Sequence, residues 1–206
     1  MGTFQVYGRK RVFVIPSRVM SNVLKPALIF AVSAIVLAII LVLMGRDWIC
    51  PCGRVDFWAG PGAPAIEGSQ HLLDLYSPSH LIHGIAFYGA LVLLARRLDL
   101  NLRLAIALIV EAGWEILENT PMVINHYRAV TISVDYNGDS VINSVFDLVA
   151  MAVGFYLARW IPVWASVAIV IGLEVLTAFL IRDGLTLNVL MLFWPVESVL
   201  QWQQGV

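Results

Sequence analysis

Ionisable side chains recur in this sequence at intervals that would place them on single helix faces. Near the start of one apolar segment stand His80 and His83, which share a face because they lie three residues apart. Two histidines so spaced can bind one metal ion, and His71 in the preceding loop is a further candidate ligand. The simpler interpretation is that these histidines hydrogen-bond to lipid headgroups or to loop carbonyl groups.

The next apolar segment ends with three glutamates on one face. Glu111, Glu115 and Glu118 follow the i, i+4, i+7 pattern, and Glu111 lies ~10 Å deeper along the helix than Glu118. Three negative charges on one face repel one another, so this pattern favours either protonation or a bound cation. The alternative is one structural glutamate, hydrogen-bonded to a neighbour, with two solvated ones.

A third polar face follows the turn sequence Asn-Gly. Asp139, Asn143 and Asp147 are spaced i, i+4, i+8 on a predicted helix, and Ala150 and Gly154 continue the same face with small residues that allow close helix packing. Asp139 also stands where a helix N-cap is expected. Asp147 lies two turns inside the helix, where capping does not explain it.

Polar residues near the end of the last long apolar segment are expected to complete the site. Glu174 lies within that segment, and Arg182, Asp183 and Asn188 follow it. Arg182 is a candidate for binding an anionic headgroup or a phosphate. Its simpler role is an ion pair with Asp183.

Two cysteines, Cys50 and Cys52, flank a proline just after the first apolar segment. In an oxidising compartment they can form a disulfide, and they can also bind a metal or stay reduced. Their spacing differs from the CxxC pattern of redox helices, and we therefore assign them a structural role.

Composition identifies the elements that must position these residues. Of the 206 residues, 60% are hydrophobic and only 13% are charged, with a mean hydropathy of +0.83. Soluble domains are about half apolar and about one quarter charged. We therefore predict an all-α, polytopic membrane helix bundle formed by residues 1–206 as a single domain. The net charge of -1 does not bear on nucleic-acid binding, but the lack of a basic stripe and of an RNA-binding signature argues against nucleic acid as a partner.

Five apolar stretches are long enough to be considered as membrane spans. They are Ala27–Met44, Pro78–Ala95, Leu102–Glu118, Val141–Ala158 and Pro162–Ile181. The tail at 187–204 is short and interrupted by Pro195 and Glu197, which favours a C-terminal interfacial helix over a sixth span.

The distribution of basic residues predicts the orientation of these spans. Nine of the thirteen Lys and Arg residues fall in the segment 1–26, in the 96–103 connection and at Arg159. The positive-inside rule then places residues 1–26 in the cytoplasm and the loops 45–77 and 119–140 in the periplasm of a bacterium. All four histidines and thirteen of the fourteen acidic residues would lie toward the periplasmic side.

Five sequence blocks resemble, in order, those of a bacterial family of inner-membrane proteins without an assigned function. The blocks are CPCG, SQH…SPSHLIHG, EAGWEILENTP, YNGDSVINSVFD and IRDGLTLN, between Cys50 and Gln204. The order of H..G, E…E and GD…D is also similar, more distantly, to the VanZ-like membrane proteins. The resemblance implies an integral protein of the bacterial inner membrane and implies no particular reaction.

The polar faces lead us to predict a metal-dependent hydrolase or transferase that acts on a lipid or a lipid-linked envelope substrate. Divalent Zn, Mn or Mg would be held by residues of all three faces, and carboxylates with one arginine would serve catalysis. The predicted metal ligands are His80, His83, Glu111, Glu115, Asp139 and Asp147, and the predicted catalytic residues are Glu111, Glu115, Asp147 and Arg182.

Two other classes of function also fit these residues. One is a proton or cation transporter, in which the buried carboxylates form a relay. The other is an assembly partner in the cell envelope, in which the polar residues hold the helices together. The sequence does not specify the metal, the substrate, the oligomeric state or any protein partner.

Overall fold

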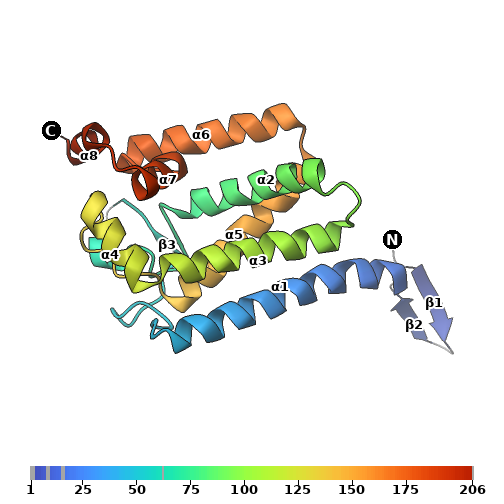
Figure 1. Cartoon of the computed structure of the whole chain (residues 1–206). Coiled ribbons are helices and arrows are strands. Elements are labelled where there is room, and N and C mark those ends of the chain that lie inside the picture. Colours follow the sequence, from blue (N-terminus) through green and yellow to red (C-terminus); the bar gives the residue numbers. More distant parts are fainter. Residues whose placement is uncertain (1–2, 8–9, 15–16, 62, 206) are drawn as a thin grey trace.

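The computed structural model describes residues 3–7, 10–14, 17–61 and 63–205, most of which are helical (Figure 1). The helices are α1 (Ser17–Leu43), α2 (Ser77–Leu94), α3 (Leu100–Glu118), α4 (Pro121–Val130), α5 (Val141–Trp160), α6 (Val163–Ile181), α7 (Leu185–Phe193) and α8 (Glu197–Gln204). Strand β1 (Thr3–Tyr7) pairs antiparallel with β2 (Lys10–Val14), and β3 (Trp58–Ala59) pairs parallel with β4 (Leu73–Asp74). A short 3-10 helix, η1, covers Ala65–Glu67. The all-α prediction is confirmed.

The prediction of five membrane spans is only partly confirmed. Among the described residues, four helices, α1, α2, α5 and α6, are long and apolar enough to cross a membrane. Helix α3 ends at Glu118 as expected and begins two residues before the expected Leu102, but Arg103, Glu111, Glu115 and Glu118 make it too polar to qualify. Figure 1 shows α3 running alongside α1 and α2, and two of its glutamates, Glu111 and Glu115, are fully buried. Its charge therefore faces the protein interior.

Apolar side chains on the outer helices are widely exposed. Leu28 on α1 is 65% exposed and Phe179 on α6 is 84% exposed, and the spanning window of α6 is only 6% buried. Burying apolar surface is favourable in water, so such faces are typical of helices that contact lipid. The exposure supports a membrane location for this bundle.

The buried apolar core lies where α1, α3 and α5 meet. It includes Leu37 and Leu41 of α1, Leu108 of α3, and Leu148 and Phe155 of α5, all with no exposed surface. This core joins α3 to its neighbours and fixes the rotation of its glutamate face.

Helices α2 and α5 touch along their backbones. A Cβ atom added to Gly84 of α2 would lie 1.9 Å from the carbonyl oxygen of Met151, and one added to Gly154 of α5 would lie 2.0 Å from the carbonyl oxygen of Leu81. Only glycine permits this approach. The small-residue face predicted around Gly154 therefore packs against the helix that carries His80.

The segment after α1 docks on the beginning of α5. The first backbone N–H groups of a helix have no partner within it. The N–H of Val141 donates to the carbonyl of Asp47 at 2.8 Å, and the N–H of Ser140 donates to the carbonyl of Ser69 at 3.0 Å. The connection between α1 and α2, called the first outer connection after its predicted side of the membrane, thus supplies acceptors for the start of α5.

Two predicted segments differ from expectation. The 119–140 loop contains helix α4, which begins at Pro121 after the capping residue Thr120. The expected single interfacial helix at 187–204 is two short helices, α7 and α8, which Trp194, Pro195 and Val196 separate because proline cannot continue a helix. Figure 1 shows α4, α7 and α8 at one end of the bundle and the β1–β2 hairpin at the other.

Candidate functional site

Helices α2 and α3 bring two histidines against one glutamate. Nδ1 of His80 lies 2.7 Å from Oε1 of Glu111, and Nδ1 of His83 lies 3.0 Å from Oε2 of the same carboxylate. Glu111 has no exposed surface and His80 is 6% exposed. Glu111 therefore accepts an N–H from both rings, and this assigns the proton of each ring to Nδ1.

The other nitrogen of His80 points toward α5. Its Nε2 lies 3.8 Å from Oδ1 of Asp147, while Nδ1 is bound to Glu111. Histidines that bind metals commonly donate their second N–H to a carboxylate, which fixes both tautomer and ring orientation. The Glu111–His80 pair has this arrangement, with Nε2 left available on the Asp147 side.

Glu115 lies between these groups without a hydrogen bond. It is fully buried, and neither of its carboxylate oxygens has a hydrogen-bond partner, although Oε1 lies 3.3 Å from Nδ1 of His80. Most buried polar groups in proteins are paired. Two unpaired oxygens on one buried carboxylate make Glu115 a candidate ligand for an ion.

Asp139, just before α5, is held by three hydrogen bonds with Asn119 and Tyr136. Its Oδ2 accepts from Nδ2 of Asn119 at 2.8 Å, its Oδ1 accepts from the hydroxyl of Tyr136 at 3.0 Å, and its backbone N–H donates to Asn119. Burial raises the pKa of Asp139, and hydrogen bonds with Glu118, Asn119 and Tyr136 oppose that effect. Ser140, not Asp139, caps α5, because its hydroxyl accepts from the N–H of Asn143.

Three overlapping groups of side chains could hold a metal ion. In each group one ligand atom per residue lies within 4.8 Å of the others. The groups are His80, His83 and Glu111; His80, Glu115 and Asp147; and Glu115, Glu118 and Asp139. Nitrogen mixed with carboxylate oxygen suits Zn²⁺ or Mn²⁺, and an all-carboxylate group suits Mg²⁺ or Mn²⁺.

A pocket opens onto this cluster, with about 770 Å³ of empty space including its mouth. The lining includes polar and acidic side chains, with His80, His83, Glu118, Asp139 and Asp147 among them. It also includes apolar side chains from α3, α4 and α7. The apolar lining residues are Trp114, Val123, Leu185, Val189 and Leu192.

A buried carboxylate joins the tail helices to the rim of the pocket. Oδ2 of Asp183 accepts from the hydroxyls of Tyr76 at 3.1 Å and Tyr127 at 3.4 Å, and Oδ1 accepts from Nε2 of Gln203 at 3.3 Å. Burial raises the pKa of Asp183 to about 6, although these donors oppose the effect. The hydroxyl of Tyr127 also donates to Asn188 of α7.

Comparison with known proteins assigns the family of the chain. Residues 41–205 match the model of a family described as "Protein of unknown function (DUF2585)". The chain belongs to this family. The UPF0314 protein of Paracoccus denitrificans is 59% identical over 169 residues, covering 82% of this chain and 87% of that protein. A UPF0314 protein of Rhizobium meliloti is 56% identical over 164 residues, covering 80% and 83%. No solved structure matches.

The DUF2585 match agrees with the resemblance to an uncharacterised bacterial family. It does not extend to the VanZ-like proteins or to the individual sequence blocks. Its residues 41–205 include all of the predicted metal ligands and the whole lining of the pocket.

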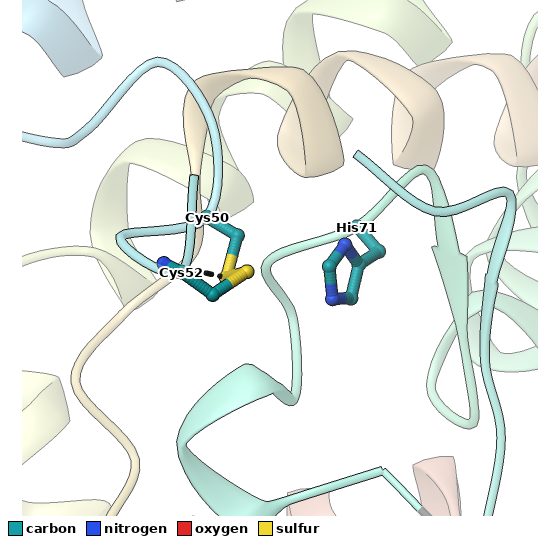
Figure 2. A group of neighbouring side chains, drawn as sticks. All are labelled: Cys50, Cys52 and His71. Atoms are coloured by element: carbon teal, nitrogen blue, oxygen red, sulfur yellow. Dashed lines mark hydrogen bonds between the residues drawn. A yellow bond between two sulfur atoms is a disulfide. The ribbon is translucent and has the colours of Figure 1, made fainter. Parts of the chain in front are cut away.

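His71 does not join His80 and His83. Its Nδ1 accepts from the backbone N–H of Asp56 at 3.1 Å, and its Nε2 lies 3.3 Å from Glu67. Figure 2 shows the ring beside Cys50 and Cys52, which form a disulfide. His71 could share a metal with Asp56 and Glu67, whereas the cysteines, joined in a disulfide, have no thiolate to offer. Both ring nitrogens already have partners, which favours a structural role.

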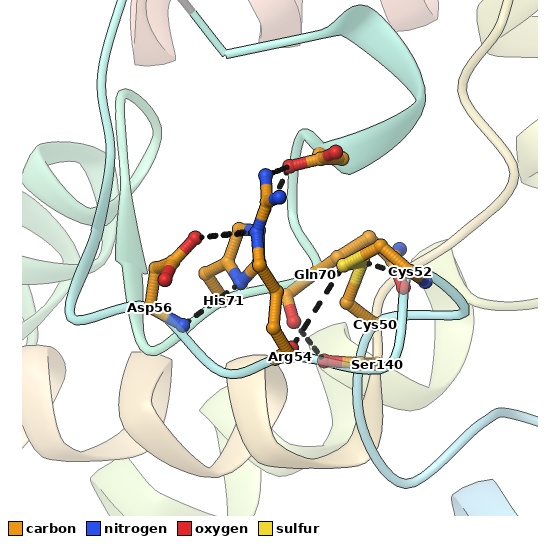
Figure 3. The surroundings of a disulfide bond; sticks show 8 residues. Cys50, Cys52, Arg54, Asp56, Gln70, His71 and Ser140 are labelled. Carbon is orange, nitrogen blue, oxygen red and sulfur yellow. Dashed lines mark hydrogen bonds and ion pairs between the residues drawn. A yellow bond between two sulfur atoms is a disulfide. The ribbon is translucent and has the colours of Figure 1, made fainter.

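The surroundings of the disulfide form a polar network within the first outer connection (Figure 3). Arg54 pairs with Asp56 at 2.9 Å and with Glu67 at 2.6 Å. The hydroxyl of Ser140 donates to the carbonyl of Gln70 at 3.0 Å, which ties this network to the start of α5. The structural role assigned to the cysteines fits this arrangement.

Other predicted site residues lie outside the pocket. The amide of Asn143 donates to the carbonyl of His71 at 2.8 Å, and Arg182 donates to the carbonyl of Trp202 at 3.1 Å. Glu174 accepts from the N–H groups of Leu185 and Thr186, both at 3.1 Å, and so caps α7. The lining of the pocket contains none of Asn143, Glu174 or Arg182, which have structural contacts instead, and the buried Glu111 and Glu115 are not among its lining residues either.

The sequence reasoning missed several residues that position the site. Asn119 continues the i, i+4 series of Glu111 and Glu115, so its place on the same face was available from spacing alone. Tyr76, Tyr127 and Tyr136 come from outer segments without a repeating pattern. Their role depends on tertiary contacts and had no sequence signal.

Proposed function

We propose that this protein binds a divalent metal ion between His80, Glu115 and Asp147, and uses it to catalyse hydrolysis or phosphoryl transfer on a lipid or lipid-linked substrate. The observation that carries the proposal is the fully buried carboxylate of Glu115, both of whose oxygens lack a hydrogen-bond partner. A histidine nitrogen and a second carboxylate lie within 4.8 Å of it.

A metal ion accounts for Glu115 better than helix-to-helix adhesion does. A buried polar group without a partner costs about 1–3 kcal/mol, and more if it is charged. Polar residues that only hold helices together should form hydrogen bonds with one another, as Glu111 does with His80 and His83. Glu115 has no such partner, so its position favours ion binding over the assembly role.

The pocket supports an amphipathic substrate. Its acidic residues would place a reacting group beside the ion, and its apolar residues, among them Leu185, Val189 and Leu192, would receive hydrocarbon. A metal ion lowers the pKa of bound water and polarises carbonyl or phosphoryl oxygens. Arg182, which bonds to the tail, has no part in this proposal.

We also propose that α3 crosses the membrane with α1, α2, α5 and α6, shielded by them, and that the pocket faces the periplasm. The nine-to-four distribution of basic residues supports this orientation. A reporter enzyme fused after Asn137 should be active in the periplasm, and one fused after Arg97 should be active in the cytoplasm. The reverse pattern would reject the orientation.

The experiment that tests metal binding compares Glu115→Gln with Glu197→Gln. Glu197 is an exposed residue of α8, so its variant makes the same chemical change away from the pocket. The proteins are purified in detergent, loaded with Mn²⁺ or Zn²⁺, and assayed for bound metal. We expect Glu115→Gln to weaken metal binding at least tenfold and Glu197→Gln to leave it unchanged. Equal metal binding by both variants would reject the site.

Activity is tested with the metal-loaded protein in mixed micelles. The probes are a fluorescent phosphatidylglycerol and a polyprenyl diphosphate, and product formation is followed by chromatography. Wild type should convert one of these probes in a reaction that chelator stops, and Glu115→Gln should be inactive. Metal binding without conversion of either probe would reject the enzymatic part of the proposal.

A further inference from the structure

Two of the candidate metal groups share one side chain. Glu115 belongs to the group with His80 and Asp147 and also to the group with Glu118 and Asp139. A carboxylate has two oxygens, and in Glu115 neither has a hydrogen-bond partner. Glu115 therefore has the free oxygens to contribute to both groups.

We infer that the site holds two divalent cations bridged by the carboxylate of Glu115, and that its substrate carries a phosphate ester or diphosphate. This inference rests on the proposed function, because it concerns the same pocket. In two-metal sites the ions lie ~3.5–4 Å apart and stabilise both the attacking and the leaving oxygen of a displacement.

Charge in the cluster favours two ions over one. Glu111 is matched by N–H groups of His80 and His83. Four other carboxylates remain, namely Glu115, Glu118, Asp139 and Asp147. When metal binding displaces the proton that Glu118 and Asp139 share, one divalent ion would leave two of these four charges unmatched in a largely buried site, whereas two ions match all four. Asp74 lines the same pocket and is already satisfied by donors of Tyr76 and Ser77. Buried charges are costly unless they are paired or coordinate metals.

Each proposed half-site contains a ligand that is already oriented by a neighbour. Glu111 fixes the ring of His80 in one half. Asn119 and Tyr136 fix the carboxylate of Asp139 in the other. Outer contacts of this kind typically hold metal ligands in place. Both half-sites therefore contain a ligand whose orientation is fixed by hydrogen bonds, as is common in metal sites.

The same charges define the substrate class. The residues that line the pocket include four acidic side chains, Asp74, Glu118, Asp139 and Asp147, and include neither lysine nor arginine. An anionic group could enter such a pocket only with the help of the cations. Phosphate oxygens bind divalent cations well, and the apolar lining residues then receive the lipid part.

The test measures how many ions each chain binds. Purified full-length protein in detergent is stripped with chelator, loaded with Mn²⁺ and assayed for metal content and by electron paramagnetic resonance. We expect two Mn²⁺ per chain with a spectrum that shows magnetic coupling. One ion per chain would overturn the two-ion inference while leaving the proposed function standing. No bound ion would overturn both.

Variants that each remove one ligand show which side chains hold each of the two ions. Asp139→Asn and Asp147→Asn each remove one ligand from a different half-site and should each retain one uncoupled ion. Asp135→Asn changes an exposed aspartate in the same loop and should retain two. If Asp139→Asn misfolds, Glu118→Gln tests the same half-site. Two coupled ions in both Asp139→Asn and Glu118→Gln would overturn the inference.

Discussion

The close contact between α2 and α5 predicts a large and specific effect of single methyl groups. In Gly84→Ala the new Cβ would lie 1.9 Å from the carbonyl oxygen of Met151, about 1.5 Å inside the 3.4 Å at which ordinary contact begins. The obstacle is backbone, so no side-chain rotation can relieve it. Gly154→Ala meets the carbonyl of Leu81 at 2.0 Å in the same crossing.

The contact geometry also allows the loss of stability in Gly84→Ala to be estimated. Overpacking a tight interior costs about 1–3 kcal/mol, and a backbone clash belongs at the upper end of that range. Alanine in a helix gains up to about 1 kcal/mol over glycine, which leaves a net loss near 2 kcal/mol for Gly84→Ala. Once the helices have separated, the second alanine meets less resistance. The double variant should therefore be destabilised by much less than the sum of the single variants.

Gly89→Ala is the matched control on the same helix. A Cβ at Gly89 has no neighbour within 4 Å, so this variant should be neutral or more stable than wild type. The assay is reversible unfolding in detergent, followed by circular dichroism for both single variants and the double variant. Because α2 carries His80 and α5 carries Asp147, metal affinity should fall in Gly84→Ala and stay constant in Gly89→Ala. Equal stability of Gly84→Ala and Gly89→Ala would refute the reasoning.

Two further predictions concern the tail helices. Burial raises the pKa of Asp183 from 3.8 to about 6 in the folded protein. The folded state therefore binds this proton more tightly than the unfolded state, and the resulting stability is fully present below about pH 4. It amounts to at most about 3 kcal/mol and is lost as the pH rises through about 6. Asp183→Asn should remove this pH dependence in unfolding measurements from pH 4 to 8, and persistence of the dependence would show that another group causes it. Glu174→Gln should lose about 1 kcal/mol, because the amide offers only one acceptor to the α7 N–H groups at Leu185 and Thr186. Hydrogen exchange in α7 should quicken relative to Glu197→Gln, and unchanged exchange would exclude the capping role.

The long helices could be predicted because their signals are local. Val141–Ala158 and Pro162–Ile181 were expected from apolar composition, and the structure has α5 and α6 within two residues of these bounds. The outer segments were harder. Helix α4 has a mixed sequence whose beginning is marked only by Thr120 and Pro121, and it is positioned partly by His126, which bonds to the carbonyl of Leu192.

In the site, too, local spacing was predictable and tertiary contacts were not. Spacing placed Glu111 and Glu115 on one face of α3, and the structure brings that face against His80. Spacing could not distinguish Glu111, which is hydrogen-bonded to two histidines, from Glu115, which forms no hydrogen bond, because the difference depends on the rotation of α2. Arg182 was selected for its charge, yet the turn after α6 directs it toward the tail.

The docking of the first outer segment on α5 bears on how the protein matures during synthesis. Asp47 and Ser69 leave the ribosome well before Val141 and Ser140. Their backbone carbonyls accept the hydrogen bonds from the N–H groups of those two later residues. Until α5 has been inserted, the carboxylates of α3 have no Asp147 opposite them. The order of synthesis therefore leaves Glu115 more accessible before α5 is in place than afterwards. If Glu115 binds a metal ion as proposed, the ion would reach it most readily during biogenesis, before α5 is in place.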